Sequence, residues 1–186
     1  MPVLISLLRG INVGGNKMVK MDALRAVYES LGLRDVQTWL NSGNVVFQAG
    51  AADLARLSKR IEAAIERTFD FHCDVILRTT SDLRDVIARN PFAARRDINP
   101  SRLLVTFLPS DPGEQARNQV RGMKTDPEEL WIDGREFYIY FPDGMARPSL
   151  SIEVIEKALK ISGTGRNWNT TRKLLEIAEK LEGVRR

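Results

Sequence analysis

The chain holds one histidine and one cysteine, His72 and Cys73, and they are adjacent. A Cys–His pair makes a nucleophile only when the imidazole can take the proton of the thiol. Residues 72–77 form a short apolar run that predicts a strand, in which neighbouring side chains point to opposite faces. The two side chains therefore cannot act as a dyad, and we interpret Cys73 as a small buried apolar residue. One imidazole among scattered carboxylates gives no metal-ligand pattern, so we expect no metal site.

A glycine-rich segment, GINVGGNKMV, occupies residues 10–19. A Walker loop ends in Gly-Lys-Ser/Thr, whereas here Lys17 follows Asn16 and precedes Met18. The sequence also has no G-x-G-x-x-G at a strand–helix turn and no G-x-S-x-G around a serine. We therefore expect no cofactor. No catalytic residue stands out, so the sequence leaves open whether the protein is an enzyme.

The hydrophobic pattern of the first half predicts the order strand–helix–strand–strand–helix–strand. Strands are expected at residues 3–8, 36–40, 45–47 and 72–77, and helices around residues 24–31 and 54–65. The segment 41–44, Asn-Ser-Gly-Asn, is a hairpin signal between the second and third strands. This order is the split βαβ pattern of ferredoxin-like folds.

The second half repeats this order less completely. Strands are expected at residues 103–108, 129–132 and 135–141, and helices after a capping Asp111 and at residues 152–159. The fourth strand is expected to be missing, or reduced to a few residues near Ile161. We predict an α+β protein of two ferredoxin-like halves, residues 1–90 and 101–186, joined by a linker at residues 91–100. The second half is degenerate and carries an extra C-terminal helix.

The net charge of +4 comes from the first half. Residues 1–96 hold 14 Lys+Arg against 10 Asp+Glu, and residues 97–186 hold 14 against 14. This mild excess permits an acidic partner without requiring one. The N-terminal apolar run is too short for a signal peptide, and no run approaches the ~18 apolar residues of a spanning helix. We expect a cytoplasmic protein, monomeric or homodimeric, with no membrane partner.

Six segments together resemble one bacterial family. They are LLRGINVGG at 7–15, SGNVVF at 42–47, NPF at 90–92, LVTFL at 104–108, PDGM at 142–145 and RNWNT at 166–170. With these motifs the chain is similar to the family catalogued as domain of unknown function 1697. The resemblance implies a two-part α+β fold, and it implies no activity and no catalytic residues.

The first candidate site joins the glycine-rich loop to the first hairpin. In the split βαβ topology the loop after the first strand and the second-to-third hairpin lie at the same end of the sheet. Glycine N–H groups, Arg and Lys suit an anion. The alternative is a long turn with positive φ that asparagine side chains tie to the hairpin. The predicted ligand-binding residues here are Arg9, Asn12, Gly14, Gly15, Lys17 and Asn44.

The second candidate site is the segment 162–170, where Arg166 and Asn167 precede the C-terminal helix. Free N–H groups at a helix N-terminus beside an arginine can hold phosphate or carboxylate. The alternative is structural: the glycines end one helix, Asn169 or Thr170 caps the next, and Trp168 packs into the core.

A third set is aromatic and falls on the sheet faces that point away from the helices. A two-residue turn at residues 133–134 pairs Ile132 with Arg135 and Leu130 with Phe137, which places the aromatic side chains on the opposite face. RNA-recognition modules stack bases on such a face. The alternative is burial, between the halves or in a dimer, because large open apolar patches are rare on monomers. The residues of this aromatic face are Trp39, Trp131, Tyr138 and Tyr140.

These patterns favour a binding module for an anionic ligand, either nucleic acid or a phosphorylated metabolite. One alternative is a small-molecule enzyme that stabilises an oxyanion with backbone N–H groups and Arg or Lys. Another is a role in protein interaction only.

Overall fold

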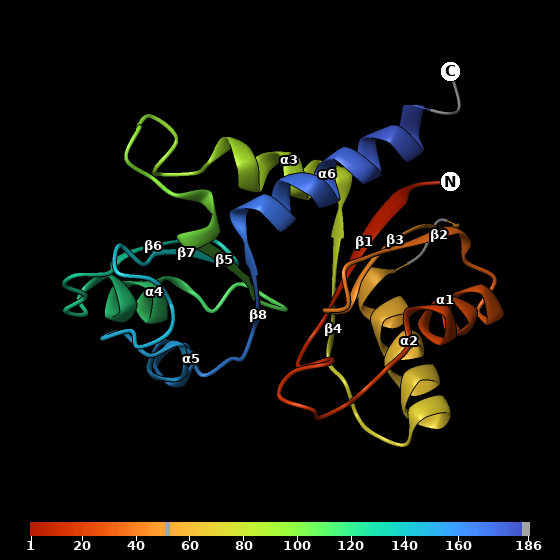
Figure 1. Ribbon diagram of the computed structural model, residues 1–186. Coiled ribbons are helices and arrows are strands. Elements are labelled where there is room, and N and C mark those ends of the chain that lie inside the picture. The colour runs from red at the N-terminus through yellow and green to blue at the C-terminus, as the bar shows by residue number, and fades with distance from the viewer. Residues whose placement is uncertain (51–52, 184–186) are drawn as a thin grey trace. The chain divides into compact units, whose positions relative to one another are not determined.

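The computed structural model describes residues 1–50 and 53–183 and divides into two compact units. One unit is Met1–Arg84 together with the chain from Lys173 onward, and the other is Asp85–Arg172. Two helices, α3 (Thr80–Ala88) and α6 (Trp168–Gly183), each contribute residues to both units (Figure 1). Residues 184–186 of the expected second half lie outside the described residues.

The first unit is built on a four-stranded antiparallel sheet in the order β2-β3-β1-β4. Its strands are β1 (Val3–Leu8), β2 (Arg34–Trp39), β3 (Asn44–Gln48) and β4 (Val75–Thr79). Helices α1 (Met21–Ser30) and α2 (Leu54–Phe69) pack on one face (Figure 1). The Asp53 carboxylate caps α2 by accepting from the Ala55 and Arg56 N–H groups.

Both faces of this sheet are buried along β1 and β3, which explains why these two strands carry apolar residues at consecutive positions. Leu4, Phe47 and Leu77 point into the core beneath α1 and α2. On the opposite face, Ile5 and Val46 are also almost fully buried. Apolar side chains therefore point to both faces, and period-two alternation is weak along β1 and β3.

The second unit repeats the same sheet order, β6-β7-β5-β8. Its strands are β5 (Leu103–Phe107), β6 (Glu129–Asp133), β7 (Glu136–Tyr140) and β8 (Thr164–Asn167). Its helices are α4 (Glu114–Arg121), α5 (Ile152–Leu159) and the short 3₁₀ turn η1 (Pro100–Arg102). The predicted fold class, two ferredoxin-like α+β halves with a C-terminal helix, is confirmed.

The fourth strand of the second half is not missing: it is reduced to four residues, as the second expectation held, but it lies at Thr164–Asn167 rather than at Ile161. Residues 164–167, which the sequence suggested were a loop, pair antiparallel with β5, Thr106 opposite Gly165. The sequence does not predict this strand because Gly163 directly precedes it and Gly165 lies within it. A β-carbon on Gly163 would lie 2.5 Å from the Phe107 carbonyl oxygen, and one on Gly165 would lie 3.2 Å from the Leu104 side chain. Close packing on β5 thus requires residues that disfavour strands.

The predicted register of the second hairpin is also wrong. Ile132 pairs with Phe137 and Asp133 with Glu136, so the turn residues are Gly134 and Arg135. Each predicted partner moves along β7 by two residues. Because side chains alternate with a period of two, this shift leaves every side chain on its predicted face.

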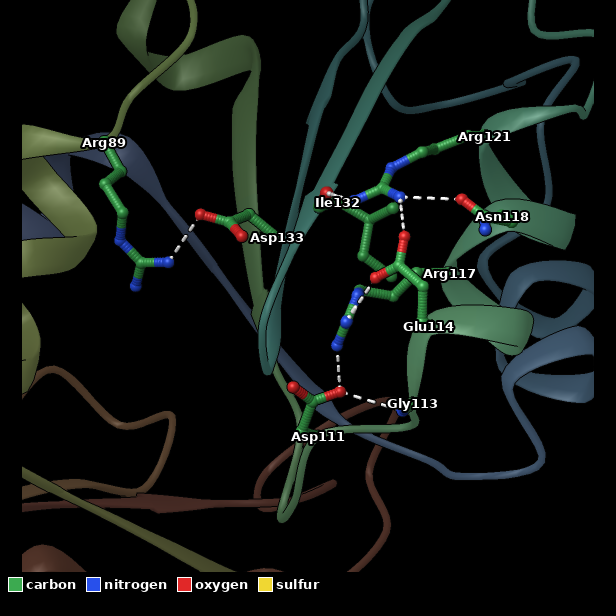
Figure 2. A network of polar contacts seen from close by, with 9 residues as sticks. All are labelled: Arg89, Asp111, Gly113, Glu114, Arg117, Asn118, Arg121, Ile132 and Asp133. Atoms are coloured by element: carbon green, nitrogen blue, oxygen red, sulfur yellow. Dashed lines mark hydrogen bonds and ion pairs between the residues drawn. The ribbon is translucent and has the colours of Figure 1, made fainter.

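Helix α4 begins later than its sequence suggests. Its N-cap is Gly113, with φ +90, and Asp111 does not cap it. Instead, an Asp111 carboxylate oxygen accepts the Gly113 N–H over 2.8 Å and pairs with Arg117 (Figure 2). Glu114 then pairs with Arg117 over 2.5 Å and with Arg121 over 2.9 Å. The acidic residues at this helix start therefore form ion pairs with arginines one and two turns later, and they do not form a capping box.

Candidate functional site

The glycine-rich loop after β1 folds back on itself as a small hairpin. Val13 and Asn16 form an isolated antiparallel bridge, and the Asn12 N–H donates to the Lys17 carbonyl over 3.2 Å. At its tip Gly14 and Gly15 have φ of +59 and +78, a backbone shape that glycine adopts without strain. Both glycines are exposed.

The Asn12 side chain ties this loop to the turn between β2 and β3. Its Nδ2 donates to the Asn41 carbonyl over 2.7 Å and to the Val19 carbonyl over 3.0 Å, and its Oδ1 accepts the Val19 N–H over 2.7 Å. The expected adjacency of the two segments is therefore confirmed. We call residues 9–20 and 40–44 together the loop–hairpin end.

Two further contacts fix the turn against β1. The Leu8 N–H donates to the Gly43 carbonyl over 2.9 Å, and a β-carbon on Gly43 would stand 2.6 Å from the Leu8 β-carbon. The buried Asn44 side chain donates to the Trp39 carbonyl over 3.0 Å and to the Ser42 hydroxyl over 2.9 Å. Asn44, expected to bind a ligand, thus shapes the turn from inside. Asn12 and Asn44 thus make hydrogen bonds that hold the loop and the turn, as the structural alternative expected.

The loop–hairpin end carries three cations and no carboxylate of its own. This basic trio consists of Arg9, Lys17 and Lys20. The Lys17 ammonium donates to the His72 carbonyl over 2.7 Å and lies 5.7 Å from the centre of the Phe71 ring. The Arg9 guanidinium is 3.9 Å from the Asp74 carboxylate, with both side chains about half exposed. Exposed pairs of this kind contribute little to stability, because water screens both charges.

Three large apolar side chains are exposed at the same end, and the sequence reasoning did not find them. They are Val13, Met18 and Leu40, which are 63%, 65% and 56% exposed. Ile11 and Val19, in the same loop, are buried. We call the exposed residues the apolar trio. No periodicity marks them in the sequence, because the loop is neither helix nor extended strand.

The strand expected at residues 72–77 begins only at Val75, so strand alternation does not apply to His72 and Cys73, but the two side chains have different partners. Cys73 is buried, and its Sγ donates to the Arg9 carbonyl over 3.4 Å. Burial raises the pKa of this thiol to about 11, so it is protonated at neutral pH and is a poor nucleophile. His72 instead lies 3.0 Å from an Asp74 oxygen and 3.7 Å from a Glu66 oxygen.

The second candidate segment lies in strand β8 and at the start of α6. Arg166 is almost fully buried, and its Nη1 donates to the Thr164 hydroxyl over 2.7 Å and to the Gly165 carbonyl over 2.8 Å. The Asn167 carboxamide oxygen accepts the Thr170 N–H over 2.9 Å, so Asn167 caps α6 and neither Asn169 nor Thr170 does. Trp168 is buried, as the structural alternative expected.

The four residues of the aromatic face have different environments. Trp131 is directly opposite Tyr138 in the β6–β7 ladder, yet it is 53% exposed while Tyr138 is fully buried. The Tyr138 hydroxyl donates to the Val86 carbonyl of α3 over 2.7 Å. Tyr140 is buried and contacts the Phe92 ring, 6.0 Å between centres. Trp131 is therefore exposed in the single chain, and its burial in a dimer stays a prediction.

Trp39 is partly buried on the face of the first sheet opposite α1 and α2. The Lys173 ammonium of α6 lies 5.2 Å from the centre of its ring. This is a cation–π contact within the first unit. The C-terminal part of α6 is also held to the start of α3 there, because Arg84 pairs with Glu179 and Glu182 over 2.8 Å each.

Within residues 1–50 and 53–183, no group of three or more His, Cys, Asp and Glu residues is arranged to hold a metal ion. In the same described part of the chain, no helix combines the length and apolar content needed to cross a membrane.

Residues 1–138 match a family described as "Protein of unknown function (DUF1697)". The chain belongs to the DUF1697 family. The matched span of this DUF1697 protein includes the whole loop–hairpin end, whereas residues 166–170 lie beyond it. A solved structure described as conserved bacterial protein SP0830 from Streptococcus pneumoniae is similar to it, with a TM-score of 0.69 and 25% identity. That match covers 95% of this chain and 98% of the other. No curated protein matches the chain.

Proposed function

We propose that this DUF1697 protein is a binding module for an anionic ligand, and that the loop–hairpin end is its binding surface. The observation that carries the proposal is the concentration of charge: two segments joined by one asparagine carry three cations and no carboxylate. Such a local excess of one sign attracts a ligand of the other sign.

The contacts of the basic trio support this function. The Arg9 guanidinium lies 3.9 Å from the Asp74 carboxylate, and because water screens these half-exposed groups, an incoming phosphate can compete for the guanidinium. Lys17 uses one of its three ammonium N–H donors on the His72 carbonyl, a neutral acceptor, so its charge is not cancelled by that bond.

The rigidity of the surface also supports binding. Asn12 and the Gly43–Leu8 contact fix the loop before any ligand arrives. A ligand that meets a fixed surface loses less free energy to ordering than one that must first order a loop. The asparagines that shape the loop are therefore compatible with binding by the cations displayed on it.

The test compares two variants with the same change of net charge. Arg9→Gln/Lys17→Gln alters the surface, and Arg60→Gln/Arg67→Gln alters two exposed cations of α2 as the control. Binding is measured with pyrophosphate by calorimetry and with a labelled oligonucleotide by fluorescence anisotropy. The proposal expects the first variant to lose most of its affinity for at least one probe and the control to keep it. Equal losses in both variants, or no binding of either probe by the wild type, would refute it.

A further inference from the structure

We infer that the loop–hairpin end binds single-stranded nucleic acid, with phosphates at the basic trio and base faces against the apolar trio. This inference rests on the proposed function of the same surface and specifies its ligand. The cations supply affinity for phosphate, and the exposed aliphatic side chains supply contact with the apolar faces of the bases.

The exposure of the apolar trio has no explanation in the packing of the loop. Ile11 and Val19 already fill the space beneath it, being 1% and 7% exposed. The three bonds of the Asn12 side chain hold the backbone, so the outward direction of Val13 and Met18 is a fixed feature of this surface. Aliphatic side chains held in water favour a partner that covers them.

Leu40 extends this surface onto the neighbouring segment. It immediately precedes Asn41, whose carbonyl accepts the Asn12 hydrogen bond, and it is 56% exposed with φ +57. A positive φ is costly for leucine, whereas asparagine would adopt it more readily. The chain therefore keeps an apolar side chain here at a position that local backbone preference does not explain.

Charge and chemistry together select the ligand class. A phosphorylated metabolite would satisfy the cations and leave apolar side chains on two segments uncovered. A nucleic acid strand offers phosphates and apolar base faces at regular spacing, and those faces are accessible only when the bases are unpaired. A second copy of this chain would cover the apolar trio but would bring three further cations against the first three, which opposes association.

The experiment measures binding of the full chain to a fluorescein-labelled strand of about 16 nucleotides, as DNA and as RNA, and to the matching duplex. Affinities are measured between about 50 and about 200 mM salt. The test variant is Met18→Gln/Leu40→Asn, which leaves the net charge unchanged and places asparagine where φ is positive. Circular dichroism and a thermal melt verify that it folds as the wild type does.

Three results are expected. The single strand binds more tightly than the duplex, and its log K falls with log salt with a slope of about −2, as three phosphate contacts require. Met18→Gln/Leu40→Asn weakens single-strand binding about tenfold with the slope unchanged. Arg9→Gln/Lys17→Gln reduces the magnitude of the slope by about 1.4.

Other outcomes overturn the inference. If Met18→Gln/Leu40→Asn binds the strand like the wild type while Arg9→Gln/Lys17→Gln loses it, the anion-binding function stands and the contact with bases fails. If the duplex binds as tightly as the single strand, or more tightly, the anion-binding function likewise stands and the contact with bases fails. Binding to phosphatidylserine vesicles in place of oligonucleotides would assign the surface to a membrane, and a dimer in light scattering that this variant dissociates would assign it to a second copy.

Discussion

The side-chain amide of Asn12 donates a hydrogen bond to the carbonyl of Asn41 over 2.7 Å, and so joins two segments that are 29 residues apart in the chain. The same amide also bonds Val19 in both directions. One side chain therefore fixes the loop to itself and to the neighbouring turn. Lys17 and Lys20 of the basic trio lie in or next to the loop that this residue holds, although none of its own atoms is charged.

Replacing Asn12 by Asp should loosen this end of the sheet. A carboxylate keeps the acceptor for the Val19 N–H but cannot donate to the Asn41 or Val19 carbonyls. The backbone φ of +55 suits Asp almost as well as Asn, so lost hydrogen bonds dominate the effect. We expect about 1–2 kcal/mol less free energy of unfolding in urea. Unchanged stability would mean that water replaces both donors without cost.

Gly43→Ala should be among the most damaging single-methyl changes in the first unit. Gly43 has φ +73, and the added carbon would stand 2.6 Å from the Leu8 β-carbon, which cannot move without moving β1. Strain and overlap together should cost about 3 kcal/mol. Gly14→Ala is the matched control, because its φ is +59 but nothing lies within 4 Å. It should cost about 1 kcal/mol in the same urea titration. Equal costs would show that the overlap relaxes.

Cys73 should react slowly and make the protein less stable at high pH. Burial raises the pKa of its thiol to about 11, so the thiolate is about one part in a thousand at pH 8. Alkylation by iodoacetamide should be roughly a hundredfold slower in the native protein than in urea, and its rate should rise with pH well past 9.

The linked effect on stability has a defined sign. The unfolded thiol loses its proton near pH 8.5 and the folded one near 11, so this contribution is complete below about 8.5 and declines as pH rises. By pH 10 the loss of folding free energy from this thiol should amount to about 2 kcal/mol. Cys73→Ala should remove that part of the decline. A decline of the same size in Cys73→Ala would show that other groups cause it.

The topology and the meeting of the two site segments could be derived from the sequence, because both follow from connectivity. The sequence shows four apolar runs, with one helix between the first and second and another between the third and fourth. With the hairpin signal at 41–44, this order defines a split βαβ unit, and that unit places the loop beside the hairpin. The apolar trio could not be derived. Whether Val13 or Ile11 points outward depends on a loop backbone with several positive φ values. Neither the helical nor the strand period of the sequence predicts the direction of side chains on such a backbone.

The register of the second hairpin shows a different limit. Asp133-Gly134 is a strong turn signal, but the structure turns at Gly134 and Arg135. Arg89 pairs with Asp133 over 2.7 Å and with Glu136 over 3.3 Å (Figure 2 shows the first pair), and these two residues are directly opposite in the ladder. This contact from outside the hairpin favours Asp133 as a strand residue. Local turn preference contains no information about it.

Trp131 should account for most of the iodide quenching of tryptophan fluorescence. It is 53% exposed, whereas Trp168 is 8% exposed and Trp39 is partly covered by Lys173. Trp131→Phe should therefore remove most of the quenching, and Trp168→Phe should leave it. If Trp131→Phe quenches like the wild type, Trp131 is covered in solution, and a partner or second copy would be the cause.

Gly163→Ala should test whether strand β8 depends on the absence of a side chain. The added carbon would lie 2.5 Å from the Phe107 carbonyl oxygen and 2.9 Å from the Thr106 methyl group. Because the nearest atom belongs to the backbone, β8 must move away from β5, at a cost of about 2–3 kcal/mol. Gly122→Ala is the control in the same unit, with φ −83 and its nearest contact at an ordinary 3.6 Å. It should change stability by about 0.5 kcal/mol or less. A loss in Gly163→Ala no larger than this would show that β8 accepts a side chain there, and the glycine would then need another explanation.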